Sequence, residues 1–206
     1  MNSISHHQTE RNTHRVQASR DELVDLLARA LREDGEAEPL KGLYLNRASS
    51  VMEPLHSMYS PVFCVIAQGS KEVFLSNERY VYDPSHYLLV TAELPLVSHV
   101  LEASKEQPYL ALRLELDPTL VGSIMVEAGD VARKKHTDVK AVNVSSLEAG
   151  LLDAVVRLVR LLEAPTEAPF LAPLITREIV YRLWMSEQRE RLRHIAASGS
   201  PPSHAR

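Results

Sequence analysis

The stretch YSPVFCVIAQGSKEVFLSNERYVYDPSHYLLVTAELPLVSHVLEASKEQPYLALRLELDP, residues 59–118, decides the fold of this chain. Apolar residues recur in it at a spacing near two, and Pro, Gly, Asn and Asp separate the runs, which is typical of many short β-strands. In the last run the even-numbered residues 110–116 are all leucine and share one face, whereas Tyr, Ala, Arg and Glu occupy the odd-numbered face. The pattern extends back to Gly42 and predicts an all-β sandwich or barrel.

Two turns divide this stretch. Ser76-Asn77-Glu78 has side chains that bond the backbone and tolerate a left-handed conformation, so we expect a hairpin there. Asp83-Pro84-Ser85 predicts a second turn before the next strand.

Helical patterns flank the strands. Residues 1–18 carry three histidines and no apolar period, so they are expected to be a mobile leader, and Ser19 to Glu22 forms a capping box that predicts a helix start. After Pro118 the pattern predicts helices over 120–127, 146–163 and 170–197, and the last two are expected to form an antiparallel hairpin.

Four phrases in the β-rich stretch carry a family resemblance. They are QGxKxV from Gln68, YDPxHYLLV from Tyr82, ELPL from Glu93 and PYLALRLELDP from Pro108. With these phrases the chain resembles the amino-terminal regulatory domain of AraC-type (AraC/XylS family) transcription regulators. The resemblance implies an α+β fold, in which a short helix precedes a cupin-like double-stranded β-barrel (jelly-roll) and a helical hairpin follows it.

The same resemblance implies a domain plan. Residues 1–18 are the flexible leader, 19–145 the effector-sensing barrel with its helix, 146–197 a helical dimerisation unit, and 198–206 a linker towards an absent helix-turn-helix half. Seven apolar positions on the two long helices are the expected dimerisation residues: Leu151, Val155, Leu158, Leu162, Ile175, Ile179 and Leu183.

Charge and composition limit the partners. The 206 residues carry a net charge of −4, so there is no global attraction to phosphate backbones, and we expect DNA contact only through the absent half. The basic run at 189–194 is interpreted as a solvated helix face, and neither it nor the run at 133–136 supplies the turn between two helices that helix-turn-helix recognition requires. One cysteine excludes an internal disulfide, and no signal or membrane-spanning run is present, so a cytoplasmic location is expected.

A small-molecule effector is the expected ligand, bound in the barrel by apolar walls and a few polar groups. Five residues on alternating strand positions are candidates for lining that site: Tyr59, Cys64, Tyr87, His99 and Arg113. Strand parity leaves two choices for every strand, so each candidate could equally be packed or solvated elsewhere. Among them, Arg113 has the geometry to bind a carboxylate with two parallel hydrogen bonds.

Chemistry beyond binding has little support in the sequence. Metal-binding cupins use a His-x-His pair, which this chain lacks, and no cofactor is expected; His56, His86 and His99 could converge only through the fold. Cys64 could act as a redox sensor, but its apolar neighbours would raise the thiol pKa. The sequence thus favours a homodimeric, non-enzymatic sensor of an AraC-type regulator, with a small cupin enzyme acting on a sugar or aromatic metabolite, or a filled interaction scaffold, as alternatives.

Overall fold

The computed structural model describes residues 3–130 and 139–198, with side chains from residue 13 to 197 inside these limits. The basic run at 133–136 and the tail at 199–206 lie outside the described residues. The strands are β1 Gly35–Leu40, β2 Leu43–Ala48, β3 Leu55–Tyr59, β4 Val62–Gln68, β5 Ser70–Leu75, β6 Glu78–Tyr82, β7 His86–Val90, β8 Leu94–Glu102, β9 Tyr109–Glu115 and β10 Val142–Ser146. The helices are α1 Ser3–Ala30, α2 Pro118–Glu127, α3 Ala149–Arg160, the short 3₁₀ turn η1 Leu161–Glu163, α4 Ala168–Trp184 and α5 Arg189–Ser198.

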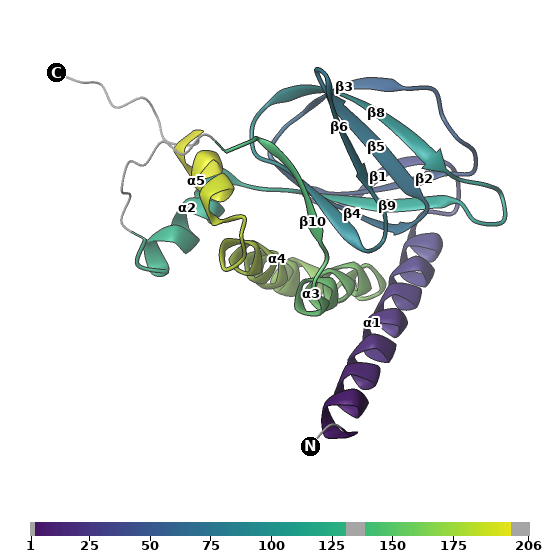
Figure 1. The fold of residues 1–206 in the computed structure, drawn as a ribbon, viewed down its shortest axis with the longest axis horizontal. Helices are drawn as coiled ribbons and strands as arrows, with labels where there is room; N and C mark the ends of the chain where they lie inside the picture. Colours follow the sequence, from purple (N-terminus) through teal and green to yellow (C-terminus); the bar gives the residue numbers. More distant parts are fainter. Residues whose placement is uncertain (1–2, 131–138, 199–206) are drawn as a thin grey trace.

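The strands form two antiparallel sheets that face each other (Figure 1). One sheet has six strands in the order β1-β2-β9-β4-β7-β10, and the other has four in the order β3-β8-β5-β6. The expected hairpin joins β5 to β6 through Ser76, whose φ is 53°, and Asn77. At the second expected turn, the Asp83 carboxylate accepts the backbone N–H of Ser85 at 2.8 Å. The predicted double-stranded barrel is confirmed.

Both faces of the six-stranded sheet are buried. On β4, Phe63, Val65 and Ala67 join the larger hydrophobic cluster under the helices, whereas Cys64 and Ile66 join a second cluster between the sheets. The same alternation runs along β9, where all the leucines from 110 to 114 face the helices. A single strand therefore contacts the helices with one set of side chains and the barrel interior with the other.

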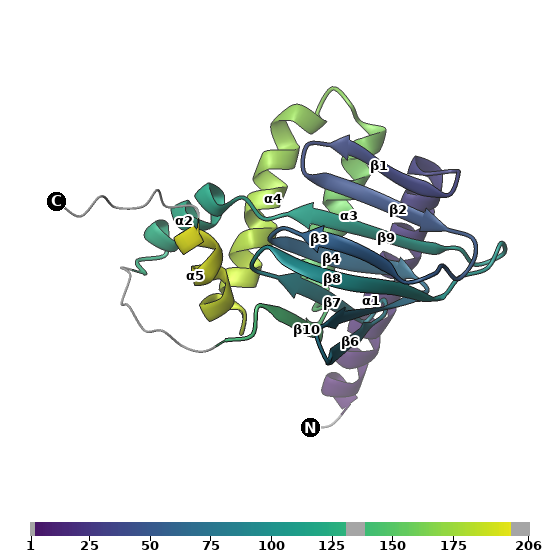
Figure 2. The ribbon, with the colours of Figure 1, turned by 90° about the horizontal axis from the view of Figure 1, so that it is seen from above.

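Three helices, α1, α3 and α4, cover the outer face of this sheet (Figure 2). The expected helix before the barrel is present, but it is longer than predicted, since α1 begins at Ser3 rather than at Ser19 and spans 28 residues. The side chain of Gln17 bonds that of Asp21 at 2.8 Å, one helical turn apart, and Val16 packs against the core. Ser19 is consequently inside a continuous helix rather than at its amino-terminal cap.

The carboxy-terminal helices match the prediction in part. After η1 and a turn, α4 packs against α3, as the expected hairpin requires. The predicted helix over 170–197 is interrupted after Trp184, where the Ser186 hydroxyl donates to the Leu183 carbonyl at 2.7 Å and the chain turns into α5. The strand β10 was missed entirely; it pairs with β7 and ends at Ser146, where a helix was expected to begin, and α3 starts only at Ala149.

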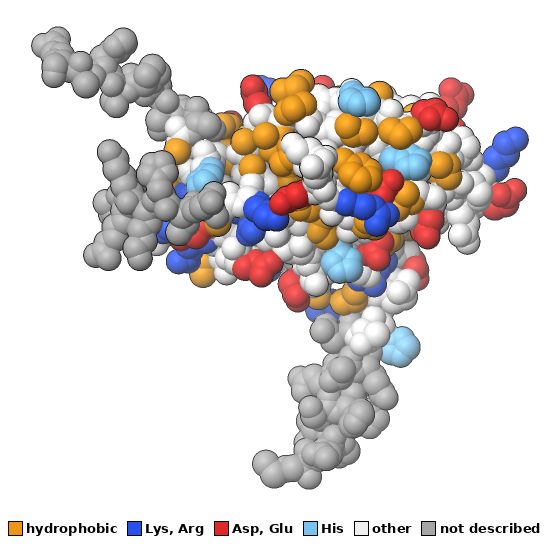
Figure 3. Space-filling view, turned by 45° about the horizontal axis from the view of Figure 1, so that its top comes forward, with side chains coloured by type: hydrophobic (Ala, Val, Ile, Leu, Met, Phe, Trp, Pro, Cys, Tyr) orange, Lys and Arg blue, Asp and Glu red, His pale blue; other side chains and the backbone are white. Residues whose placement is uncertain are grey.

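Within the described residues, no helix covers the outer face of the four-stranded sheet. Figure 3 shows hydrophobic side chains distributed over this side of the molecule with histidines between them. Met58 and Val81 are exposed there, and His99 is partly exposed. The outer face of the six-stranded sheet is thus covered by helices, whereas the outer face of the four-stranded sheet is exposed to solvent.

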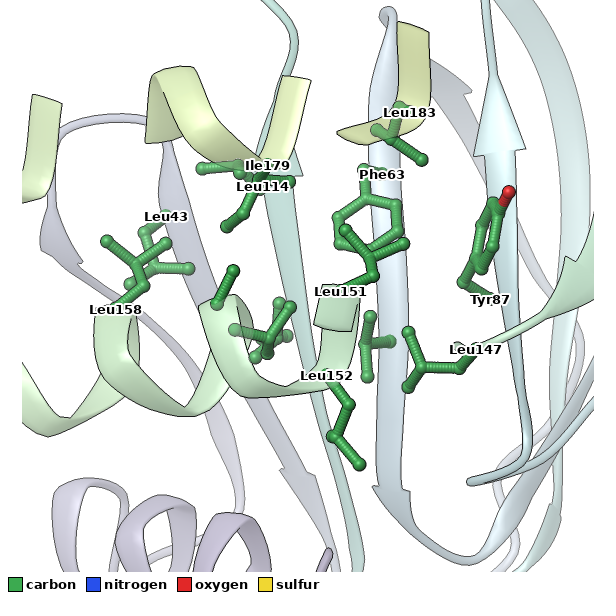
Figure 4. Close-up of a cluster of buried hydrophobic side chains, with 14 of the residues drawn as sticks. Leu43, Phe63, Tyr87, Leu114, Leu147, Leu151, Leu152, Leu158, Ile179 and Leu183 are labelled. Carbon is green, nitrogen blue, oxygen red and sulfur yellow. The ribbon is translucent and has the colours of Figure 1, made fainter. Parts of the chain in front are cut away.

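The residues expected to mediate dimerisation lie in the core of one chain. Leu151 and Leu158 of α3 point at the sheet, toward Phe63 and Leu43, and Ile179 of α4 lies beside them (Figure 4). Val155 and Leu183 are buried in the same cluster, and Leu162 and Ile175 pack against it. This part of the prediction was wrong, because an apolar helical stripe has the same spacing whether it packs on a sheet or on another chain.

Replacing Leu158 with Ala should therefore destabilise the isolated chain. Removing a fully buried leucine side chain leaves a cavity and costs about 2–5 kcal/mol of unfolding free energy. Urea denaturation followed by circular dichroism measures this change, and Val126→Ala, at an exposed position of α2, should change it by about 0.5 kcal/mol or less. If the difference in unfolding free energy between the wild type and Leu158→Ala disappeared when the protein was diluted, Leu158 would instead belong to an interface between chains.

Candidate functional site

A cavity of about 240 Å³ lies between the two sheets. Strands of both sheets line it, and its lining is mostly polar: Glu36, Asn46, Leu55, Ser57, Tyr59, Cys64, Lys71, Tyr82, Ser98, Tyr109, Ala111, Leu112 and Arg113. Most of these residues come from strand positions that face the barrel interior. Strand side chains point alternately to the helices and to the barrel interior, and at several of the inward positions the residue is polar. These inward residues form the wall of the cavity.

Gly69 brings β5 across from β4 so that Lys71 faces this cavity. Its φ is +86°, and a Cβ at this position would lie 2.4 Å from the Glu102 carbonyl oxygen, so a side chain would meet fixed backbone. The preceding Gln68 donates its side-chain N–H to the Pro108 carbonyl at 2.8 Å. Two of the sequence phrases, QGxKxV and PYLALRLELDP, thus meet at one corner of the barrel.

Lys71 is the only lysine among the residues that line the cavity. Its Nζ donates a hydrogen bond to the Tyr59 hydroxyl at 3.3 Å. Desolvation lowers the pKa of Lys71, but Tyr109, Tyr59 and Cys64 around it outweigh that effect and raise the pKa, so the amine holds its proton at neutral pH. Within the described part of the chain, no carboxylate oxygen lies within 4.0 Å of this ammonium group.

Two tyrosines complete the polar interior. Tyr82 and Tyr109 are both buried, and burial raises the pKa of Tyr109 to about 12 and the pKa of Tyr82 well above its usual value. Both phenols therefore keep their protons and can donate hydrogen bonds.

Cys64 faces the same cavity as a neutral thiol. Burial raises its pKa to about 11, although Lys71 and Arg113 nearby lower it. A thiol that holds its proton is a poor nucleophile. This environment disfavours the redox-sensor alternative and leaves Cys64 as part of the cavity wall.

Arg113 lies at the edge of the cavity with its charge already compensated. Its guanidinium donates to the Glu36 carboxylate at 2.8 Å and stacks over the Tyr44 ring, 4.9 Å from the ring centroid. Its Nε is buried and has no hydrogen-bond partner among the described residues. Arg113 thus closes one end of the cavity and keeps one donor free.

Three comparisons place this architecture among known proteins. The family model for the AraC-type transcriptional regulator N-terminus matches residues 39–191. The chain belongs to this family. No curated protein matches the sequence.

Solved structures of AraC-type proteins resemble this AraC-type domain. ToxT from Vibrio cholerae, bound to (E)-4-(8-methylnaphthalen-1-yl)but-3-enoic acid, is 12% identical with a TM-score of 0.50, over 73% of this chain and 57% of ToxT. Another ToxT structure, an apo form from strain SCE256, is 9% identical with a TM-score of 0.48, over 77% of this chain and 59% of the other. The AraC-like transcriptional activator CuxR is 13% identical with a TM-score of 0.39, over 83% of this chain and 57% of CuxR. The AraC-type domain thus corresponds to less than two thirds of these chains.

The structure brings together three of the five residues expected to line the site. Tyr59, Cys64 and Arg113 do line the cavity. Tyr87 does not: it faces the helices, and its ring centroid is 5.2 Å from that of Phe63. His99 lies on the outer face of the four-stranded sheet, with Nδ1 3.0 Å from the Glu72 carboxylate.

Lys71, Tyr82 and Tyr109 were missed as site residues. One signal was available for Lys71: it shares strand parity with Val73 and Leu75, two apolar residues of the same strand. A lysine beside a turn resembles a solvated residue, and only the pairing of β5 with β8 shows which face is inside.

The histidines of the AraC-type domain do not assemble a metal site in the described residues. No group of three or more His, Cys, Asp and Glu side chains is close enough there to hold an ion. His86 contacts Asp83 through Nδ1 at 2.8 Å, and His99 contacts Glu72. No helix in the described part is long and apolar enough to cross a membrane.

Two larger hollows flank the end of α4 on the surface. One, of about 690 Å³, lies between α2 and α4, and the other, of about 670 Å³, lies between α4 and β10. Tyr181 and Met185 line both of them. These hollows are the main structural rivals to the cavity between the sheets as a ligand site.

Cys64 should react slowly with iodoacetamide in the native protein at pH 7.5. A pKa raised from 9.0 to about 11 lowers the thiolate fraction about a hundredfold, since each pKa unit is a factor of ten. The rate, measured by mass spectrometry, should rise as the pH approaches 11 and should increase at once when urea unfolds the chain. Alkylation at pH 7.5 that is equally fast with and without urea would contradict a buried neutral thiol.

Proposed function

We propose that this chain is the effector-sensing and dimerising part of an AraC-type transcription regulator that acts in the cytoplasm. The observation that carries the proposal is the polar cavity between the two sheets. Its lining combines apolar walls with a lysine, an arginine and three tyrosines, the composition expected of a small-molecule site. DNA binding is assigned to another part of the regulator, because the net charge of −4 gives this chain no general attraction to DNA.

The strands that line the cavity also support the helices. Cys64 and Arg113 face the cavity, and their neighbours Phe63 and Leu114 face α3 and α4. A ligand that fits one arrangement of β4 and β9 better than another will also favour one packing of the helices on those strands. The signal is then a shift between two populations, and its size is limited by the difference in ligand affinity for them.

The surface of α4 supplies the dimer contact in this proposal. Phe170, Leu174, Tyr181 and Met185 are 77%, 62%, 49% and 54% exposed. Successive members of this set are four or seven residues apart, which places them along one side of the helix. An exposed apolar stripe of this kind is typical of protein interfaces. In this proposal it replaces the seven positions named from the sequence, of which five are buried and two, Leu162 and Ile175, are partly buried.

Enzymatic activity is not part of the proposal. Catalysis by proton transfer needs a group poised to accept or release a proton near neutral pH. Cys64, Lys71, Tyr82 and Tyr109 all hold their protons there, and the lining carboxylate Glu36 is paired with Arg113. The cavity is thus suited to binding rather than to turnover.

Tyrosine ring signals in NMR spectra test the location of the effector site. A small molecule that raises the thermal midpoint of the domain should shift the ring ¹³C signals of Tyr59, Tyr82 and Tyr109, because these rings line the cavity. These shifts should exceed that of Tyr181, which lines both surface hollows and is reached from the cavity only indirectly, through α4. Shifts confined to Tyr181 would move the effector site to α4 and contradict the proposal.

Leu174→Glu should weaken dimerisation at least about tenfold, because a carboxylate in an apolar contact loses its hydration without gaining a partner. Sedimentation velocity at micromolar concentrations measures the effect. Val81→Glu is a matched control, since Val81 is also an exposed apolar residue but lies on the four-stranded sheet. A wild-type chain that stays monomeric, or a Leu174→Glu chain that dimerises normally, would refute the interface.

A further inference from the structure

The cavity between the sheets contains a positive charge that the described residues do not neutralise. Two cations line it, Lys71 and Arg113, together with one carboxylate, Glu36. Glu36 is bonded to Arg113 at 2.8 Å, so its charge is already compensated. Among the described residues, the ammonium of Lys71 makes one hydrogen bond, to the hydroxyl oxygen of Tyr59 at 3.3 Å.

We propose that the effector is a small monocarboxylate, whose carboxylate group binds Lys71 and the neighbouring tyrosine hydroxyls. This inference rests on the proposed sensing function and adds the chemical class of the ligand. An ammonium group away from water is costly unless an anion or several acceptors surround it. Lys71 has three N–H donors, and the Tyr59 contact uses one of them.

The hydrogen-bonding character of the site favours an acceptor-rich ligand. Lys71 offers only donors, and the protonated phenols of Tyr82 and Tyr109 add O–H groups, of which that of Tyr82 is already hydrogen-bonded to its neighbours Tyr109 and Cys64. The buried Nε of Arg113 adds one more unused donor at the edge of the cavity. A carboxylate has two oxygens that together accept up to about four hydrogen bonds and carry one negative charge, which matches the single uncompensated ammonium.

Size and the remaining walls define the rest of the ligand. Leu55 and Ala111 form apolar parts of the lining; Leu112 also borders the cavity, although its side chain packs in the cluster under the helices. The volume of about 240 Å³ is below the range of about 300–1,000 Å³ that is usual for drug-sized ligands. A single aromatic ring or a short aliphatic chain carrying one carboxylate fits these limits, whereas a long-chain acid is too large.

The test compares acids with their neutral amides of nearly equal shape. The probes are benzoate with benzamide, phenylacetate with phenylacetamide, and hexanoate with hexanamide, titrated calorimetrically into the purified chain. At least one acid should bind the wild type about tenfold or more tightly than its amide. Lys71→Met, which keeps an unbranched side chain of similar length, should abolish this preference by weakening the acid alone.

Two controls make the result specific. Lys41→Met removes a lysine from the exposed turn between β1 and β2 and should keep the full preference for acids. Tyr59→Phe should weaken acid binding less than Lys71→Met, since it removes one hydroxyl and keeps the ammonium. If Lys71→Met does not fold, the ratio of acid to amide affinity in the wild type, with the ring signals of Tyr59, Tyr82 and Tyr109, decides the question.

The outcomes separate this inference from the proposed function. Equal affinity for acids and amides, a preference for inorganic phosphate over every acid, or no binding of any acid would overturn the carboxylate assignment. Amides that bind at least as tightly as their acids and shift the signals of Tyr59 and Tyr82 would overturn it while leaving the cavity as the sensing site. Binding that shifts only Tyr181 would overturn both.

Discussion

The six-stranded sheet is buried on both faces, and the rest of the structure follows from that constraint. Helices α1, α3 and α4 cover one face with a continuous hydrophobic cluster. The four-stranded sheet covers the other, and there the inward positions include polar groups such as Lys71 and Tyr109. Because the helices bury most of the apolar side chains, the barrel interior does not have to be a fully packed core. The helices stabilise the sheet from one face, and space for a ligand can therefore remain on its other face, inside the barrel.

This arrangement also links sensing to assembly. Successive residues of β4 and β9 point alternately to the cavity and to the helices, so no side-chain network is needed to connect the two sides. In the proposed function, a small adjustment of a strand around a ligand changes the packing of α3 and α4 on it. The apolar stripe of α4 lies on the opposite side of that helix from its buried residues Ile179 and Leu183, where the proposed second chain would contact it.

The strands could be predicted well from the sequence, and the helices less well. Period-two patterns and turn residues predicted β4 to β9, because the burial of one strand face places leucine and valine at every second position. The strand β10 was missed because Val142 to Ser146 is short and half polar, and it is held in place by pairing with β7. The end of α4 at Trp184 was missed because no Gly or Pro marks it; the side chain of Ser186 caps the turn instead.

The candidate site shows the limit of strand parity. Arg113, Cys64 and Tyr59 were placed correctly, but Tyr87 faces the helices and His99 faces solvent, since a sequence defines two faces of a strand without saying which one is inside. Lys71 was overlooked because lysine is ordinarily exposed. The positions named for dimerisation pack in the core for a related reason: the stripe that packs on the sheet is more apolar than the exposed stripe on α4, and the sequence pattern shows only the more apolar one.

The most direct test is a crystal structure of this chain with whichever small molecule stabilises it most. The account predicts ligand density between the two sheets, in contact with Lys71 and the hydroxyl groups of Tyr59, Tyr82 and Tyr109. Density in the hollows beside α4, with protein side chains filling the space between the sheets, would contradict it.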